Sequence, residues 1–278
     1  MSTKFVAVGD SYTVHNLHPE TPYSWVRFLS ESKGWDEINL GSPGASNSYI
    51  LNKAFDSIEE HAPDVMIVMW SDPFRINLFD IAHQILESEK NLMTWLEGAK
   101  QQHEDPNLNK YENYIERTSE ITRLYTEIMK SRPIRKSSII DCYVSIVNTS
   151  LRKFYMLQEL CRMAGTQFYH VQSLPTIGGQ AGLDILLQDF ESTDINTVVQ
   201  EVKNTRYYKL LSESKEWMGF DFIASNYIKK NNMVISPLNH HPTTEGHKRL
   251  ANIIGKYIDD EIRITGNGEA DRPTYVYD

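Results

Sequence analysis

The stretch that decides the fold is Phe5–Thr13, which reads FVAVGDSYT near the start of a chain of 278 residues. Its apolar run is short, contains the β-branched residues Val6 and Val8, and ends at Gly9. Such a run is typical of a strand that is buried on both faces of a parallel sheet. Ser11 follows at the carboxyl end of this predicted strand, where open α/β sheets bind their ligands. From these residues alone, Ser11 is either a reactive serine or a polar turn residue.

The alternation of strand, turn and helix continues along the chain. The further predicted strands are Glu37–Leu40, Val65–Met69, Gln167–Val171 and Met233–Ile235. The first three strands end in polar or glycine-rich turns, and the helix expected between the second and third has one apolar face. This order predicts an α/β fold with a doubly wound parallel sheet, whose crossover connections bring every such turn to one edge.

The domain prediction is a single domain over residues 1–278, because no linker rich in proline, glycine or serine divides the chain. Residues from about 76 to 136 have an interrupted helical pattern and are predicted to form a mainly helical insertion. Residues from about 174 to 230 form either a lid over the strand ends or peripheral packing.

Composition and charge exclude several classes of partner. The formal net charge is -9 and the basic residues are scattered, which argues against nucleic-acid and membrane partners. Cys142 and Cys161 have no metal-ligand spacing, so we expect buried free thiols in a reducing compartment. No signal peptide or membrane-spanning stretch is evident, which predicts a cytoplasmic protein; release by lysis or assembly into a particle would leave no mark on the sequence. No feature of the sequence indicates an oligomeric state.

Four turns are predicted to meet at the carboxyl edge of the sheet. They contain Ser11, Gly44, the pair Ser71 and Asp72, and the pair His240 and His241. A serine hydroxyl is a poor nucleophile unless a base lies within hydrogen-bond reach, and an imidazole is such a base. The backbone N–H groups of Ser11 and Gly44 are candidate donors to the oxyanion that forms when an ester is attacked.

The order of these motifs resembles that of the SGNH hydrolases, also called the GDSL esterase and lipase family. The motifs are Gly9–Ser11, the glycine turn Asn39–Asn47, the polar turn after the third strand, and the segment His241–His247 before a C-terminal helix. The resemblance implies a flavodoxin-like three-layer α/β/α sandwich around a parallel sheet of about five strands. It implies no metal or organic cofactor.

Carried over residue by residue, the resemblance implies that Ser11 is the nucleophile and His241 the general base. The oxyanion hole would contain the N–H groups of Ser11 and Gly44, with Ser71 at the position of the third donor. Asp10 and Asp72 are candidates for stiffening their turns, and Asn239 and His240 for supporting roles. A zinc site made from His240, His241 and His247 is disfavoured, because no carboxylate or thiolate completes it at a familiar spacing.

The chain departs from the family pattern at two positions. The family's third motif is Gly-x-Asn-Asp, and here Met69–Asp72 has Ser71 where the asparagine donates to the oxyanion; a hydroxyl reaches less far than a carboxamide. The family also has an aspartate three residues before the catalytic histidine, and here Leu238 stands three before His241. Either a Ser–His dyad works with a backbone carbonyl or water holding the ring, or another carboxylate reaches in.

The functional prediction is a serine esterase that hydrolyses an acyl or acetyl ester, on a carbohydrate or another small molecule, through an acyl-Ser11 intermediate. An alternative, motivated by Leu238 and Ser71, is a catalytically inactive relative that uses the same cleft for binding or assembly. A third reading is an acyltransferase, which uses the same residues with an acceptor other than water.

Overall fold

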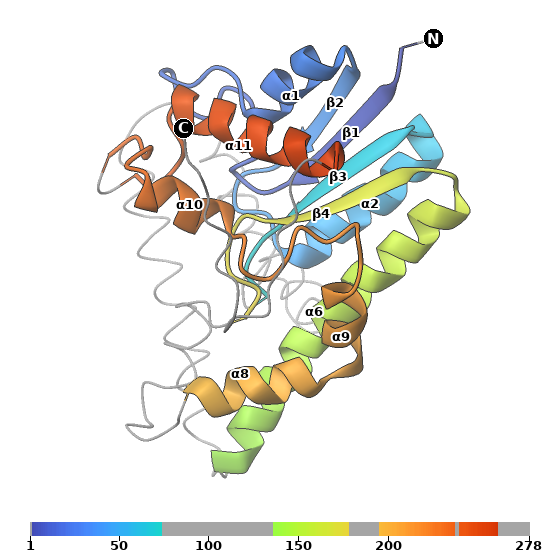
Figure 1. Ribbon diagram of the computed structural model, residues 1–278, viewed down its shortest axis with the longest axis vertical. Helices are drawn as coiled ribbons and strands as arrows, with labels where there is room; N and C mark the ends of the chain where they lie inside the picture. Colours follow the sequence, from blue (N-terminus) through green and yellow to red (C-terminus); the bar gives the residue numbers. More distant parts are fainter. Residues whose placement is uncertain (1, 74–135, 178–194, 237–238, 261–278) are drawn as a thin grey trace, which may run out of the picture. The chain divides into compact units, whose positions relative to one another are not determined.

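The computed structural model describes residues 2–73, 136–177, 195–236 and 239–260 (Figure 1). The contacts divide the chain into two units, one formed by Met1–Arg75 with Tyr143–Asp278 and the other by Ile76–Cys142. The first unit contains the sheet and is the one discussed below. Residues 76–135 of the predicted insertion and residues 178–194 of the predicted lid lie outside the described residues, so these two predictions stay predictions.

The centre of the first unit is a parallel four-stranded sheet in the order β2-β1-β3-β4. Its strands are β1 (Lys4–Gly9), β2 (Asp36–Gly41), β3 (Val65–Trp70) and β4 (Gln167–Gln172). All six residues of β3 are buried, as expected for a central strand that is covered on both faces. The predicted α/β class and parallel sheet are confirmed.

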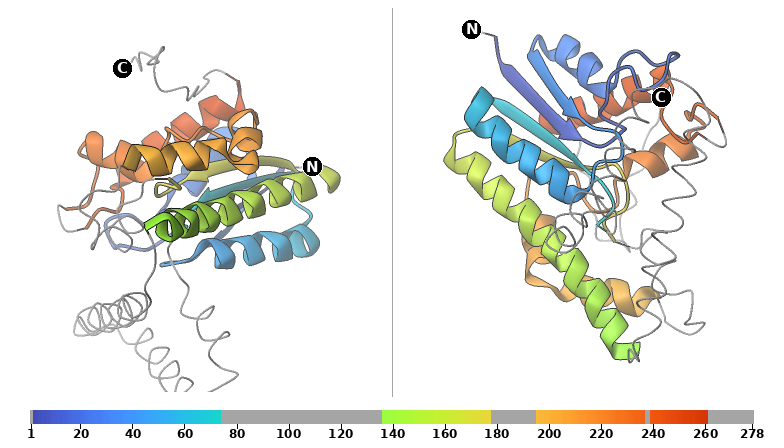
Figure 2. Two further views of the ribbon diagram at one scale, coloured as in Figure 1. Left: turned by 90° about the horizontal axis from the view of Figure 1, so that it is seen from below. Right: turned by 180° about the vertical axis from the view of Figure 1, so that it is seen from behind.

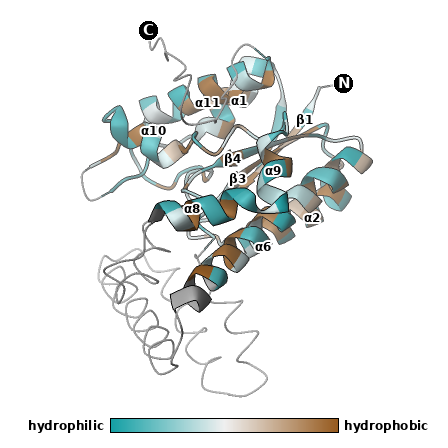
Figure 3. Ribbon diagram, turned by 60° about the horizontal axis from the view of Figure 1, so that its bottom comes forward, coloured by the Kyte–Doolittle hydropathy of each residue, from teal (hydrophilic) through white to brown (hydrophobic). Residues whose placement is uncertain are grey.

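Helices cover both faces of this sheet, with α1 and α11 on one face and α2 and α6 on the other (Figures 1 and 2). The helices of the described residues are α1 (Trp25–Lys33), α2 (Asn47–His61), α6 (Lys136–Met163), α8 (Ile195–Asn204), α9 (Arg206–Ser212), α10 (Ala224–Lys230) and α11 (Thr244–Ile258). Hydrophobic and hydrophilic residues occupy different sides of these helices (Figure 3). The three layers therefore match the expected α/β/α sandwich.

The core on the α1 and α11 side alternates along the strands. Phe5 and Ala7 of β1 point into a buried cluster that includes Trp25 of α1 and Leu250 and Ile254 of α11. This alternation is the period of two that a strand imposes on its side chains. The burial of Phe5 and Ala7 fixes which face of β1 meets these helices, and Ser11 follows two residues after the end of β1 at Gly9.

The prediction of a fifth strand at Met233–Ile235 is wrong. Val234 makes only an isolated antiparallel bridge with Pro242, and Ile235 N–H donates to the carbonyl of His241 at 3.0 Å. The segment thus pairs with the chain that returns from it, and its backbone is not available to extend the sheet. Beside β4, the chain makes only two isolated parallel bridges, at Trp217 and Ile223, so the described sheet has four strands rather than about five.

No helix within the described ranges is both long and apolar enough to cross a membrane.

Candidate active site

The turn that contains Ser11 is fixed by the buried side chain of Asp10. Its Oδ1 accepts the N–H of Tyr12 at 3.1 Å, and its Oδ2 accepts the hydroxyl of Ser173 at 2.6 Å. Ser173 directly follows β4, so Asp10 ties the end of β1 to the end of another strand. The N–H of Thr13 closes the turn on the Asp10 carbonyl at 2.9 Å. Ser11 itself is only partly buried, which leaves its hydroxyl within reach of a ligand.

Two glycines at the strand ends let the following loop close tightly over the sheet. A Cβ atom added to Gly9 would lie 2.2 Å from Thr13 Oγ1 and 3.0 Å from the carbonyl of Met69. A Cβ atom added to Gly41 would lie 2.8 Å from the backbone of Thr13. The distances of 2.2 Å and 2.8 Å are shorter than non-bonded atoms tolerate. The absence of a side chain at Gly9 and Gly41 is therefore what allows the loop after Ser11 to pack there.

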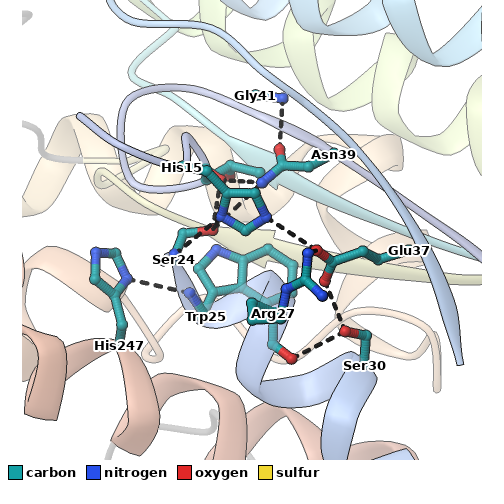
Figure 4. A network of polar contacts seen from close by, with 10 residues as sticks. His15, Ser24, Trp25, Arg27, Ser30, Glu37, Asn39, Gly41 and His247 are labelled. Atoms are coloured by element: carbon teal, nitrogen blue, oxygen red, sulfur yellow. Dashed lines mark hydrogen bonds and ion pairs between the residues drawn. The ribbon is translucent and has the colours of Figure 1, made fainter. Parts of the chain in front are cut away.

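A network of polar contacts also holds the loop that follows Ser11 (Figure 4). Asn39 of β2 donates its Nδ2 to the carbonyl of Thr13 at 2.7 Å and accepts the N–H of Gly41 at 2.9 Å. Ser24, which precedes α1, donates its hydroxyl to the same Thr13 carbonyl at 2.7 Å. The chain beyond the Ser11 turn is therefore anchored to β2 and to the residue that precedes α1.

Glu37 extends this network toward the surface (Figure 4). Its carboxylate contacts His15 Nε2 at 3.2 Å and Arg27 Nη2 at 2.7 Å, and it accepts the hydroxyl of Ser30 at 2.6 Å. His15 in turn accepts the N–H of Ser24 at 3.0 Å. These contacts join the loop after Ser11 to the start of α1.

His241 lies in hydrogen-bond contact with Ser11, although 230 residues separate the two in the chain. The distance from His241 Nε2 to Ser11 Oγ is 2.9 Å. On the other side of the ring, His241 Nδ1 lies 2.8 Å from Oδ1 of Asn239, which also accepts the backbone N–H of His241 at 3.2 Å. A backbone N–H can only donate, so the Asn239 atom that faces the histidine is the oxygen.

The tautomer of His241 follows from that contact. An amide oxygen can only accept, so the proton of a neutral imidazole must be on Nδ1. Nε2 then presents its lone pair to the hydroxyl of Ser11. Hydroxyl, imidazole and carboxamide thus form one chain of hydrogen bonds, and the third member is Asn239, two residues before the histidine. Leu238, three residues before it, lies outside the described residues.

Tyr12 links the turn that contains Ser11 to the loop that contains His241, and sequence reasoning missed this contact. Its hydroxyl donates to the carbonyl of His240 at 2.9 Å, and its ring centroid lies 5.8 Å from that of His241. The side chain of His240 is exposed, and the ring that meets Ser11 is that of His241. Nothing in the spacing of a tyrosine beside a serine indicates such a contact, which depends on two loops that meet only in the fold.

The backbone N–H groups of Ser11 and Gly44, which were predicted to face an oxyanion, make no hydrogen bond to other described residues. Gly44 has φ +72°, a backbone conformation that glycine adopts without strain. The hydroxyl of Ser71 is fully buried and has no partner within the described part of the chain.

Asn47, the first residue of α2, holds Ser71 in place. Its Oδ1 accepts the N–H of Ser71 and its Nδ2 donates to the carbonyl of Ser71, each at 2.8 Å. This reciprocal pair fixes the backbone of Ser71 directly after β3. Asp72, the next residue, is also buried. Asparagine after a glycine turn is a helix-start signal, which gives no indication of a contact with the end of β3.

A cavity of about 220 Å³ adjoins this turn. Its lining consists of Asn47 and Ser48 at the start of α2, Pro73, and the α6 residues Ser145, Ile146, Thr149, Ser150 and Lys153. Lys153 Nζ donates to the hydroxyl of Ser48 at 3.3 Å. Hydroxyl groups and one ammonium group dominate this lining, so it suits a polar ligand group rather than a long alkyl chain.

His247 serves the fold. Its Nδ1 accepts the N–H of Trp25, the first residue of α1, at 3.2 Å. Burial is the main cause that lowers the pKa of His247 to about 3, and the nearby His15, His241 and His18 lower it further. His247 is thus a buried residue that accepts a backbone N–H group at the start of α1. Within the described ranges, no group of three histidine, cysteine, aspartate or glutamate residues is placed to hold a metal ion.

Cys161 is free and buried, as expected. Desolvation raises the pKa of its thiol to about 12, so the thiol stays protonated and unreactive. The side chain of Cys142 lies outside what the structure describes.

Comparison with solved structures finds a likeness to proteins of the G-D-S-L lipolytic family. A lipase/acylhydrolase from Enterococcus faecalis is 14% identical, with 94% of this chain and 97% of that chain covered and a TM-score of 0.41. A lipolytic protein of the G-D-S-L family from Veillonella parvula is 13% identical, with 93% and 97% covered and a TM-score of 0.40. A catalytic mutant of an acetylxylan esterase from Geobacillus stearothermophilus is 14% identical, with 93% and 95% covered and a TM-score of 0.39.

No protein-family profile matches this chain, and no curated protein matches it in sequence. The likeness to the solved structures is one of fold.

Proposed function

We propose that this protein is a serine esterase that hydrolyses an acyl or acetyl ester through a covalent acyl-Ser11 intermediate. The observation that carries the proposal is the hydrogen-bonded chain from Ser11 through His241 to Asn239, with distances of 2.9 Å and 2.8 Å. A hydroxyl, a base within reach of it, and a third group that orients the base are the geometric signature of an activated nucleophile.

In the acylation step, Ser11 Oγ attacks the carbonyl carbon of the ester while its proton passes to His241 Nε2. The carbonyl oxygen becomes an oxyanion, and the unengaged N–H groups of Ser11 and Gly44 are its proposed donors. The buried hydroxyl of Ser71 is a third donor that has no other partner among the described residues. His241 then gives its proton to the departing alkoxide, which leaves as an alcohol, and the acyl group stays on Ser11.

In the deacylation step, water replaces the alcohol and the same groups act in the same order. His241 Nε2 takes a proton from water as the water oxygen attacks the acyl carbon. The second tetrahedral intermediate collapses when His241 returns that proton to Ser11 Oγ and the carboxylic acid leaves. No atom other than those of ester, water and enzyme enters this cycle.

We assign the orienting role to Asn239, so that a carboxamide two residues before His241 would take the place of the family's carboxylate three residues before it. The contact from His241 Nδ1 to Asn239 Oδ1 supports this assignment. The oxygen of Asn239 fixes the tautomer of His241, which is one of the two tasks of the third residue in a catalytic triad. It adds no negative charge to stabilise the imidazolium, so a smaller electrostatic contribution is expected. Cysteine proteases of the papain type use a neutral asparagine in the same role.

The substrate proposal is an ester on a carbohydrate or another polar small molecule. It is supported by the polar cavity that Asn47 and Pro73 line, where Ser48 and Lys153 offer donors to hydroxyl or carbonyl groups. An inactive protein that uses the same cleft for binding is the alternative, and an acyltransferase would use the same acyl-Ser11 intermediate with another acceptor.

The test is hydrolysis of p-nitrophenyl acetate by the purified protein, with Ser11→Ala as the comparison. The proposal expects turnover that falls by about 10^4-fold or more in the variant, the size seen when a nucleophilic serine is removed. Turnover that persists in Ser11→Ala would show a different nucleophile. No turnover in the wild type, together with an intact biological role in Ser11→Ala, would favour the inactive binding protein. Faster consumption of the ester when a polyol acceptor is added, with formation of the acylated polyol, would favour the acyltransferase.

A further inference from the structure

We propose that His18 is a positioning residue that fixes the orientation of the Asn239 carboxamide and thereby keeps His241 in the tautomer that can deprotonate Ser11. This inference rests on the proposed function, since it assigns His18 a role in the same reaction. It names a fourth member of the hydrogen-bonded chain, one that the sequence gives no reason to single out.

The contact that carries the inference joins Asn239 to the loop after the nucleophile. Asn239 Nδ2 lies 3.3 Å from His18 Nε2, and the rings of His18 and His241 have centroids 5.0 Å apart. The amide nitrogen can only donate, so His18 Nε2 must accept and carry no proton. His18 is itself held in a short turn, because its carbonyl accepts the N–H of Thr21 at 3.0 Å.

A carboxamide in this position needs such a partner, whereas a carboxylate does not. The two ends of an asparagine side chain have nearly the same shape, and a half-turn of the amide exchanges them. In the exchanged orientation an N–H group would face His241 Nδ1, so Nδ1 would have to accept and the ring proton would move to Nε2. An Nε2 that carries the proton cannot take another from Ser11. Both oxygens of an aspartate accept, so the same rotation would leave the site unchanged.

Two contacts together select the productive orientation. The backbone N–H of His241 requires an oxygen on one side of the amide, and the lone pair of His18 requires an N–H group on the other. Without the His18 contact, the orientation of the amide depends on the two contacts that Asn239 Oδ1 makes. One is the 3.2 Å bond from the backbone N–H of His241, and the other is the 2.8 Å bond to the His241 ring, whose proton can move to Nε2. The fraction of molecules with a competent His241 should then fall.

The charge state of His18 belongs to the same argument. Burial lowers the pKa of His18, and Glu20 opposes that shift. Three other histidines lie near His18. The ring of His241 lies beside that of His18, and His247 interacts electrostatically with His18, His15 and His241. A protonated His18 would present an N–H group to Asn239 and favour the exchanged orientation, so it would disable the base.

The experiment is a double-mutant cycle that measures kcat and KM for p-nitrophenyl acetate. His18→Leu removes the acceptor, His18→Gln keeps an acceptor without a titratable group, and Asn239→Asp removes the need for an orientation. We expect His18→Leu to lower kcat about 10-fold, which corresponds to about 1.4 kcal/mol, with KM unchanged. We expect His18→Gln to keep kcat within about 3-fold, since its amide oxygen can accept from Asn239 Nδ2.

The decisive comparison is His18→Leu in the Asn239→Asp background. The inference expects a change in kcat of less than about 3-fold there, because a carboxylate has no wrong orientation. An equal loss in both backgrounds would assign His18 a merely structural role and overturn the inference, as would an unchanged kcat for His18→Leu in the parent background. Thermal unfolding of each variant checks that the protein is folded in every measurement.

The pH profile gives a second readout. Two histidines, His18 and His241, must both be neutral in the wild type, so log(kcat/KM) should fall with a slope approaching two on the acid side. In His18→Gln the slope should approach one, and an unchanged slope would contradict the inference.

If the wild type itself does not hydrolyse the ester and Ser11 is not labelled by a fluorophosphonate, the proposed function fails first; if Ser11-dependent hydrolysis is intact and His18→Leu is silent, only the role of His18 fails.

Discussion

The two halves of the candidate site are built in different ways. The half with Ser11 lies at the end of a buried strand, where glycines at positions 9 and 41 allow a close backbone approach and Asp10 ties the turn to β4. The half with His241 lies in a loop outside the sheet, where Val234 and Pro242 make one isolated bridge. Backbone hydrogen bonds, such as that from Ile235 N–H to the carbonyl of His241, close this histidine loop on itself. Its contacts with the His241 ring and with the Ser11 turn are made by the side chains of Asn239 and Tyr12.

This difference explains why the sequence motif at Ser11 is easier to find than the contacts around His241. Close contacts of Gly9 with Thr13 and Met69 leave no room for a side chain at the end of β1, so the Gly9–Ser11 motif is readily found in the sequence. In the histidine loop, any group that presents an acceptor to His241 Nδ1 can orient the ring. A carboxamide two residues before the histidine does so here, in place of a carboxylate three residues before it.

The largest effect should come from His241→Ala compared with His240→Ala. Loss of the ring that contacts Ser11 should lower kcat/KM for p-nitrophenyl acetate by about 10^4-fold, as for other members of a triad. His240→Ala is the matched control, because that side chain is exposed and only its backbone carbonyl holds Tyr12. A large loss in His240→Ala with activity retained in His241→Ala would reverse the assignment of the base.

The steric half of the site should be tested by Gly9→Ala, with Gly255→Ala as the control. The new Cβ at position 9 would meet Thr13 Oγ1 at 2.2 Å, so we expect a loss of unfolding free energy of about 3 kcal/mol from overpacking. At position 255 in α11 the nearest atom would be Leu29 Cδ1 at 3.4 Å, an ordinary contact, and alanine should stabilise the helix by up to about 1 kcal/mol. Urea unfolding measures both; equal effects would contradict the steric account of the strand end.

The pH dependence of stability should report on His247, which caps α1 from the helix that follows the histidine loop. Its pKa is about 3 in the folded protein, mainly because of burial, and near 6.5 in the unfolded chain. The unfolded chain therefore binds the proton more readily, and stability that is present above about pH 6.5 is lost as the pH falls toward 3. Between pH 7 and pH 5 this group should contribute a loss of about 2 kcal/mol.

His247→Asn should remove this pH-dependent contribution while keeping an acceptor for Trp25 N–H. The measurement is urea unfolding of both proteins at several pH values, where other buried groups such as His170 affect both proteins alike. Parallel profiles for wild type and variant would show that His247 is not the group that titrates.

The smallest effect should come from Tyr12→Phe, which removes the hydrogen bond between the two halves. The variant keeps the ring against His241 and loses only the hydroxyl that donates to the His240 carbonyl. We expect a loss of about 1 kcal/mol in stability, the value of one neutral hydrogen bond, and a several-fold lower kcat with little change in KM. An unchanged kcat would show that the histidine loop holds its position without this contact.

The sequence predicted the features that follow from periodicity and from strand ends. The alternation of buried strands and amphipathic helices predicts the parallel sheet, and the sheet brings the turns of Ser11, Gly44 and Ser71 to one edge. The strand predicted at Met233–Ile235 failed because short apolar runs do not reveal their pairing partner, which here is the returning chain at Pro242.

Side-chain contacts between distant loops were beyond the reach of pattern reasoning. Asn239 was named only as a supporting candidate, because the family pattern places the orienting residue three positions before the histidine, and Leu238 occupies that position here. His18 and Tyr12 have no spacing that relates them to a histidine loop more than 200 residues later, and Asn47 resembles any helix-start residue. These contacts exist only because the fold brings their loops together.

The most direct test of the central claim is labelling with a fluorophosphonate, followed by mass spectrometry of the intact protein and of its peptides. Such a probe forms a covalent bond with an activated serine and mimics the tetrahedral intermediate. We expect a single adduct on Ser11, much slower labelling in His241→Ala and none in Ser11→Ala. An unlabelled wild type, or an adduct that persists in Ser11→Ala, would contradict the claim that the chain of Ser11, His241 and Asn239 is a working catalytic site.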